Sequence, residues 1–119
     1  MDRVAFFTHL GKEILLLDFS RLKANEAVTL IDPAKAVISK RPPHSVLTLT
    51  DVTEMSFNEE LSQRFKDFTT HNRPYVRAAA VVGVTGLKRI IYNAVIIFSR
   101  RHIATFDDRE AAKKWLAEQ

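Results

Sequence analysis

The segment with the clearest chemical potential is Gly83-Val84-Thr85-Gly86, a glycine-flanked turn ahead of a helical pattern. Such a turn presents free backbone N–H groups and the positive end of the helix dipole, and both attract anions. Lys88 and Arg89 follow and add positive charge. The alternative function that this turn suggests is binding of a small anionic or lipid-like ligand at Gly83, Thr85, Gly86 and Lys88. For the turn itself we favour a purely structural strand-to-helix role, because the lysine–hydroxyl pair of a P-loop and a full dinucleotide fingerprint are both missing.

Catalytic and metal-binding patterns are weak in this sequence. The chain has no cysteine, which excludes a cysteine nucleophile, a thiolate zinc site and an iron–sulfur centre. Its four histidines lack the i, i+4 spacing of a helical metal site, and no Gly-x-Ser-x-Gly elbow is present. Asp51 lies at the carboxyl end of a predicted strand, where α/β domains place sites, although a carboxylate there also bonds the next loop. We expect a non-enzymatic protein with no cofactor and no metal.

The helix predicted after Gly86, ending near Arg100, suggests an interaction surface. At 100° per residue, one arc is almost wholly apolar and is expected to face the sheet: Leu87, Ile90, Ile91, Ala94, Val95, Ile97 and Phe98. The opposite arc holds Arg89, Tyr92, Asn93, Ile96 and Arg100. A Tyr/Ile pair rimmed by arginines is typical of a protein contact, with a protein partner or a second copy of the chain. Scattered surface apolar residues are the alternative.

Hydrophobic periodicity and turn signals predict the elements that position these residues. Strands are predicted at residues 3–8, 13–19, 45–51, 75–83 and 102–106. The first two are separated by a glycine-containing turn and form a hairpin. Helices are predicted at residues 25–40, from a Ser56/Glu59 capping box to Asn72, from Gly86 to about Arg100, and after an Asp107/Glu110 capping box. Pro33 either marks the start of the first helix after Asp32 or interrupts a longer helix from about Asn25, and we favour the kinked or two-piece version.

The element order is therefore β-β-α-β-α-β-α-β-α, which defines an α/β fold in one domain over residues 1–119. Right-handed crossovers then produce a mostly parallel sheet with helices packed on it, in which the first strand is antiparallel.

Several stretches make the chain resemble the SpoIIAA-like branch of the bacterial STAS-type proteins, which have the anti-sigma-factor-antagonist fold. They are residues 45–52, 72–76, 81–87 and 106–108, with Ala111-Ala112 and Trp115-Leu116 near the end. The resemblance implies a regulatory domain that acts through protein contacts. The antagonists carry a phosphorylated serine in an Asp-Ser-Ser-Gly-like turn. Residues 51–59 contain no such motif, and Thr53 and Ser56 are the nearest hydroxyls.

Composition narrows the remaining function classes. The 119 residues are 46% hydrophobic and 27% charged, a globular balance. No apolar run approaches the roughly 20 residues of a spanning helix, so we expect no membrane insertion and a cytoplasmic location. The formal net charge is +4, but the basic clusters are short, so we expect no nucleic-acid partner.

Overall fold

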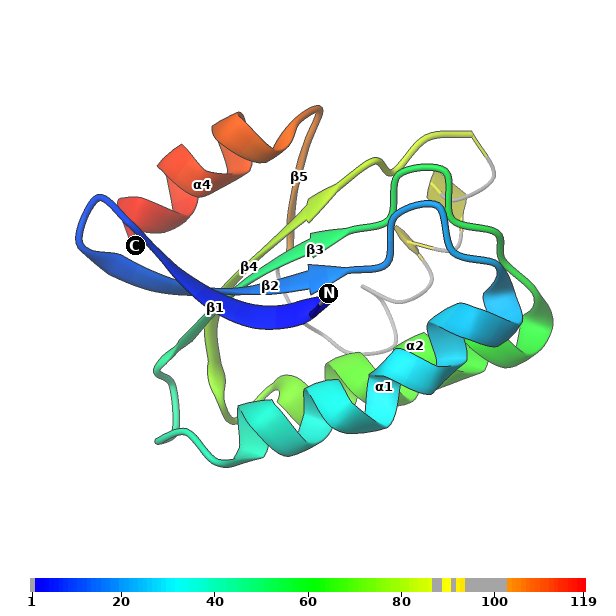
Figure 1. Ribbon diagram of the computed structural model, residues 1–119, viewed down its shortest axis with the longest axis horizontal. Helices are drawn as coiled ribbons and strands as arrows, with labels where there is room; N and C mark the ends of the chain where they lie inside the picture. The colour runs from blue at the N-terminus through cyan, green and yellow to red at the C-terminus, as the bar shows by residue number, and fades with distance from the viewer. Residues whose placement is uncertain (1, 87–88, 91, 94–102) are drawn as a thin grey trace.

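The structure, a computed structural model, describes residues 2–86, 89–90, 92–93 and 103–119. Its strands are β1 (Val4–His9), β2 (Lys12–Asp18), β3 (Val46–Asp51), β4 (Val76–Val82) and β5 (Ala104–Phe106). Its helices are α1 (Ala24–Ser39), α2 (Glu59–Asn72) and α4 (Arg109–Ala117). Figure 1 shows these elements as an α/β fold, and each predicted strand lies within a few residues of an observed one. The helix predicted after Gly86 lies largely outside the described residues.

The five strands form one sheet in the order β1-β2-β3-β4-β5. β1 pairs with β2 in antiparallel fashion, and every later pair is parallel. The predicted hairpin and the mostly parallel sheet are therefore confirmed. The hairpin turn is Leu10-Gly11, and both residues have positive φ (49° and 80°), as a two-residue turn that matches the strand twist requires.

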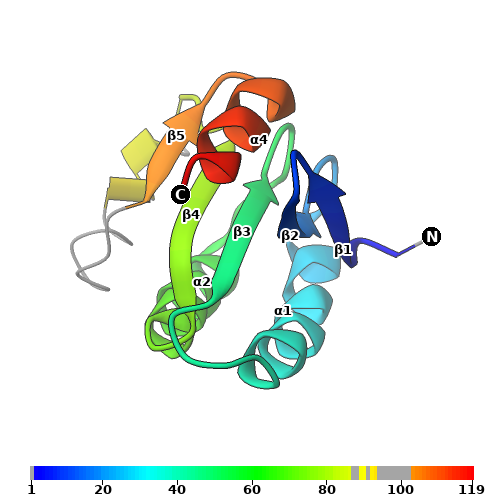
Figure 2. The ribbon, with the colours of Figure 1, turned by 90° about the vertical axis from the view of Figure 1, so that its left-hand side faces the viewer.

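Helices cover both faces of the sheet, as Figures 1 and 2 show, with α1 and α2 on one face and α4 on the other. The alternation of side chains along each strand therefore divides the core into two clusters. In β2, Leu15 and Leu17 belong to the larger cluster under α1 and α2, while Ile14 belongs to the smaller cluster under α4. In β4, Ala79 belongs to the larger cluster and Ala80 to the smaller one, so this strand is buried on both faces.

The first helix is a single element from Ala24 to Ser39 with Pro33 in its interior. The alternative of a helix that begins at Asp32-Pro33 is therefore wrong. An internal proline costs about 3 kcal/mol through its lost hydrogen bond and its clash with the preceding turn. Burial of the apolar face compensates for this cost, because Ala27, Ile31, Ala34 and Ile38 are all fully inaccessible to solvent.

Two predicted helix caps are wrong by one or two residues. Asn58, not Ser56, caps α2, and its Oδ1 accepts a hydrogen bond from Leu61 N at 2.8 Å. The helix starts later because the preceding segment is anchored to the core: Met55 is buried, and Ser56 N donates to Leu22 O at 3.0 Å. At α4 the cap is Asp108 rather than Asp107, with Asp108 Oδ1 accepting from Ala111 N at 2.8 Å.

Candidate functional site

The turn after β4 has a packing role at Gly83. Gly83 has φ +91°, and a Cβ placed on it would lie 2.5 Å from Thr53 Oγ1 and 2.6 Å from Thr53 N. Only glycine accommodates both that conformation and that approach. Val84 is buried, whereas Thr85 and Gly86 are exposed, and Lys88 lies outside the described residues. Gly86 has φ +56°, and a Cβ placed on it would have no atom of the described residues within 4 Å. Glycine is therefore favoured at this position by the backbone conformation and not by a close contact.

Tyr92 points inward and is partly buried, whereas the helical wheel predicted an outward side chain. Its ring packs against the larger core cluster, and its hydroxyl donates a hydrogen bond to the carbonyl of Ile103. Ile90, which was expected to face the sheet, is 67% exposed. Ile90 and Tyr92 are therefore placed the opposite way from the expectation of a helical wheel oriented by hydrophobicity alone. Arg89 and Asn93 are exposed, as expected, while Ile96 and Arg100 lie outside the described residues.

Burial also changes the ionisation of Tyr92. Desolvation raises the pKa of its phenol, although the nearby Arg89 guanidinium acts in the opposite direction. The hydroxyl therefore stays protonated at neutral pH and serves as a hydrogen-bond donor rather than as a base.

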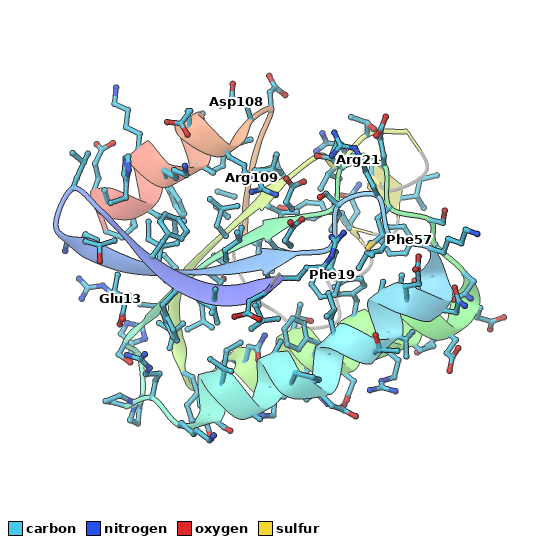
Figure 3. All side chains as sticks on the ribbon, in the orientation of Figure 1. Glu13, Phe19, Arg21, Phe57, Asp108 and Arg109 are labelled. Atoms are coloured by element: carbon cyan, nitrogen blue, oxygen red, sulfur yellow. The ribbon has the colours of Figure 1, made fainter. Side chains whose placement is uncertain are left out.

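A charged cluster occupies the carboxyl ends of the parallel strands. Asp18 and Asp51 are the last residues of β2 and β3, and their Cα atoms are register partners. Arg109, the first residue of α4, joins them: its Nε lies 2.7 Å from Asp51 Oδ2 and its Nη2 lies 3.2 Å from Asp18 Oδ1. Figure 3 shows Arg109 between α4 and the sheet. Sequence reasoning identified Asp51 but missed the other two members.

Further hydrogen bonds hold both carboxylates in place. Asp18 Oδ1 accepts from Ser20 N at 3.0 Å and from Ser20 Oγ at 2.5 Å, and Asp51 Oδ1 accepts from Thr53 N at 2.9 Å. Burial acts to raise the pKa of Asp18, but the Ser20 hydrogen bonds and the charges of Arg109 and Arg3 outweigh it, so the pKa is lowered. A carboxylate held ionised in this way is a weak proton acceptor, and the cluster therefore serves to fasten α4 to the sheet.

An apolar cavity of about 80 Å³ lies on the opposite face of the sheet, between the strands and α2. Its described lining comes from the sheet, from α2 and the residues just before it, and from the chain beyond β4. These residues are Leu17, Thr48, Thr50, Val52, Phe57, Phe65, Phe68, Thr69, Asn72, Ala79, Val81, Val84, Tyr92 and Ile103. Three phenylalanines form one wall, with ring centroids of Phe57 and Phe65 5.9 Å apart and those of Phe65 and Phe68 6.3 Å apart.

Two buried polar side chains also line this cavity. Thr48 and Asn72 are each only 3% exposed. Asn72 Oδ1 lies 2.9 Å from His71 Nδ1, but neither Asn72 Nδ2 nor Thr48 Oγ1 has a hydrogen-bond partner within the described part of the chain. Since buried polar groups are normally paired, these two atoms are candidates for hydrogen bonding to a bound molecule. Nothing in the sequence pattern of either residue indicates this role.

The described ranges contain neither a membrane-spanning helix nor a metal-binding cluster. None of the described helices combines the length and hydropathy that a bilayer crossing requires. The same residues contain no group of three or more histidine, aspartate or glutamate side chains placed to hold a metal ion. Comparison with protein-family models, with curated proteins and with solved structures finds no match to this chain.

Proposed function

We propose that this protein binds a short aliphatic molecule that carries a hydroxyl or carbonyl oxygen. The observation that carries the proposal is the aromatic-walled cavity with two buried polar groups, Thr48 Oγ1 and Asn72 Nδ2, that have no hydrogen-bond partner among the described residues. The walls take the hydrocarbon part, and either the threonine hydroxyl or the asparagine amide donates to the oxygen. Val84 lines the cavity, so this site adjoins the Gly83–Gly86 turn where a lipid-like ligand was predicted.

The size of the cavity limits the ligand. An engineered cavity of about 150 Å³ accepts benzene, so a cavity of about 80 Å³ holds a chain of a few carbon atoms rather than a ring. An anionic ligand is not favoured here, because the described lining contains no lysine or arginine.

The prediction of a STAS-type regulatory domain stays a prediction. Its expected contact surface combined Tyr92 with Ile96, and the inward direction of Tyr92 removes one of these two anchors. The SpoIIAA-like fold and a protein partner are therefore secondary proposals that rest on the sequence resemblance.

Two probes test cavity binding by NMR titration of the ¹⁵N-labelled protein: xenon, which is purely apolar, and 1-butanol, which adds a hydroxyl. We expect both to shift the amide signals of residues that line the cavity. Thr48→Val keeps the shape of the side chain but removes its hydroxyl, so it should weaken 1-butanol binding several-fold and leave xenon binding unchanged.

Two further variants make this test specific. Ala79→Leu fills the cavity and should abolish the response to both probes, provided that circular dichroism shows a folded protein. Thr70→Val, the same chemical change at an exposed position of α2, should alter neither. The proposal fails if the wild-type protein responds to neither probe, or if Thr48→Val and Thr70→Val behave alike.

A further inference from the structure

A second recess lies at the amino-terminal edge of the sheet, opposite the Asp18–Arg109 cluster. It has a volume of about 290 Å³, and its described lining is mostly polar: Phe6, Gly11, Lys12, Glu13, Arg41, Pro42, Ser45, Val46, Leu47, Arg77 and Gln119. Figure 3 shows Glu13 and Arg109 at well-separated positions along the sheet. This volume is close to the lower limit for small-molecule sites and exceeds that of the apolar cavity.

Positive charge dominates this recess. Three cationic side chains line it: Lys12 from β2, Arg77 from β4, and Arg41, which follows the end of α1. Glu13 is the single carboxylate side chain among the described lining residues. These side chains therefore carry a net charge of +2 at neutral pH. Three separate segments supply the cations, so their convergence is a product of the fold rather than of a run of basic residues.

The three cations differ in how they are engaged. Arg41 is held in place, because its guanidinium lies 3.9 Å from the centre of the Phe6 ring and its Nη1 lies 2.8 Å from Glu13 Oε1. Lys12 Nζ donates to the backbone oxygen of Gln119 at 3.0 Å. Arg77 is exposed and makes no hydrogen bond or ion pair within the described ranges. One arginine is thus preorganised while another is free to engage a ligand.

Cations also collect near the carboxyl ends of helices, where they complement the helix dipole, and α1 and α4 both end near this edge. That explanation does not cover Arg77, which belongs to a strand. Nor does it cover Arg41, whose described side-chain contacts are with Phe6 and Glu13 and not with a helix carbonyl.

We propose that this recess is a binding site for a small oxyanion, with Arg77 as its main ligand-binding residue and Arg41 and Lys12 as supporting charges. The planar guanidinium donates paired hydrogen bonds that match a phosphate or a carboxylate. The site is independent of the apolar cavity, and it takes a different class of ligand.

The test is a titration with inorganic phosphate and, in a separate arm, with acetate, followed by the ¹⁵N–¹H NMR spectrum at constant ionic strength and pH 7.5. We expect phosphate to shift the amide signals of residues 11–13, 41, 44–47 and 76–78. Tighter binding of phosphate than of acetate would assign the site to phosphate groups, and the reverse would assign it to carboxylates.

Variants at the recess and at the opposite edge sharpen the test. Arg77→Gln should weaken binding about tenfold through loss of a charge-assisted hydrogen bond. Arg21→Gln makes the same change of charge at the carboxyl edge, where Arg21 pairs with Glu54, and should leave the affinity unchanged. Glu13→Gln should strengthen binding, because it removes the competing carboxylate from Arg41. Since these side chains are exposed or partly exposed, the variants should fold, and circular dichroism checks this.

The outcomes separate clearly. Absence of phosphate- or acetate-dependent shifts in the wild-type protein up to 20 mM overturns the proposal. Equal weakening by Arg77→Gln and Arg21→Gln also overturns it, because the binding would then reflect only the net charge of the protein.

Discussion

Arg109 Nε donates to Asp51 Oδ2 at 2.7 Å, a bond that fastens the first residue of α4 to the last residue of β3. The same guanidinium reaches Asp18 at the end of β2, so one cation spans two adjacent carboxylates. Without the Arg109 guanidinium, the two negative charges of Asp18 and Asp51 would face each other at a largely buried edge of the sheet. The pKa of Arg109 reflects this position: burial acts to lower it, but the two aspartates outweigh burial and raise it.

Loss of the Arg109 side chain should therefore destabilise the fold. We expect Arg109→Met to lower the free energy of unfolding by about 3 kcal/mol, since the side chain of Asp51 is only 8% exposed and would be left unpaired. Urea denaturation at pH 7 measures this. Lys113→Met on the same helix removes the pair with the exposed Glu110 carboxylate and the contact of Lys113 Nζ with the Phe7 ring, and should cost only about 1 kcal/mol. Equal costs would show that the cluster does not fasten α4.

Acid should weaken the fold through Asp18. The pKa of this carboxyl is lowered in the folded state from its ordinary value of 3.8. The ionised carboxylate therefore stabilises the fold at pH values above that ordinary pKa. That stabilisation is lost progressively as the pH falls below about 4 and then through the pKa that Asp18 has in the folded protein. Thermal unfolding from pH 7 to pH 2.5 should show a smaller loss of Tm for Asp18→Asn than for the wild-type protein. Asp107→Asn, at an exposed position, should follow the wild-type curve, and identical curves for all three would refute the role of Asp18.

Gly83 should be the least replaceable of the glycines at positive φ. Gly83→Ala faces both the unfavourable φ of +91° and a contact of 2.5 Å with Thr53, so we expect a loss of more than about 2 kcal/mol. Gly11→Ala has a similar φ of +80° but open space around its Cβ, so it should cost about 1–2 kcal/mol. Chemical denaturation of both variants isolates the contribution of the Thr53 contact, and a smaller loss at Gly83 than at Gly11 would contradict the structure there.

The start of α2 provides a test of the corrected cap. Asn58→Ala should cost about 1 kcal/mol because it removes the acceptor for Leu61 N. Ser56→Ala should be nearly neutral, since Ser56 is exposed and its described contact uses only its backbone N–H. The midpoints of urea unfolding decide between the two positions, and a larger effect at Ser56 would restore the cap predicted from the sequence.

Local sequence patterns determined the strands, the hairpin and the mostly parallel sheet of this protein. Alternation in Val46–Asp51, the apolar run of Val76–Val82 and the turn at Leu10-Gly11 each depend on residues close together in the chain. The hydrophobic face of Ala24–Ser39 likewise outweighed the signal of Pro33. Such features are readable because backbone conformation and side-chain period are local properties.

Only the tertiary structure decided which of these elements meet and how they are rotated. Asp51 stood out in the sequence, but its partners Asp18 and Arg109 lie 33 and 58 positions away and come together only through strand order and helix placement. Tyr92 turned inward because contacts with the core, and not the amphipathic wheel, set its direction. The buried Thr48 and Asn72 became a candidate site for the same reason: a cavity is the space left between elements, and no single segment encodes it.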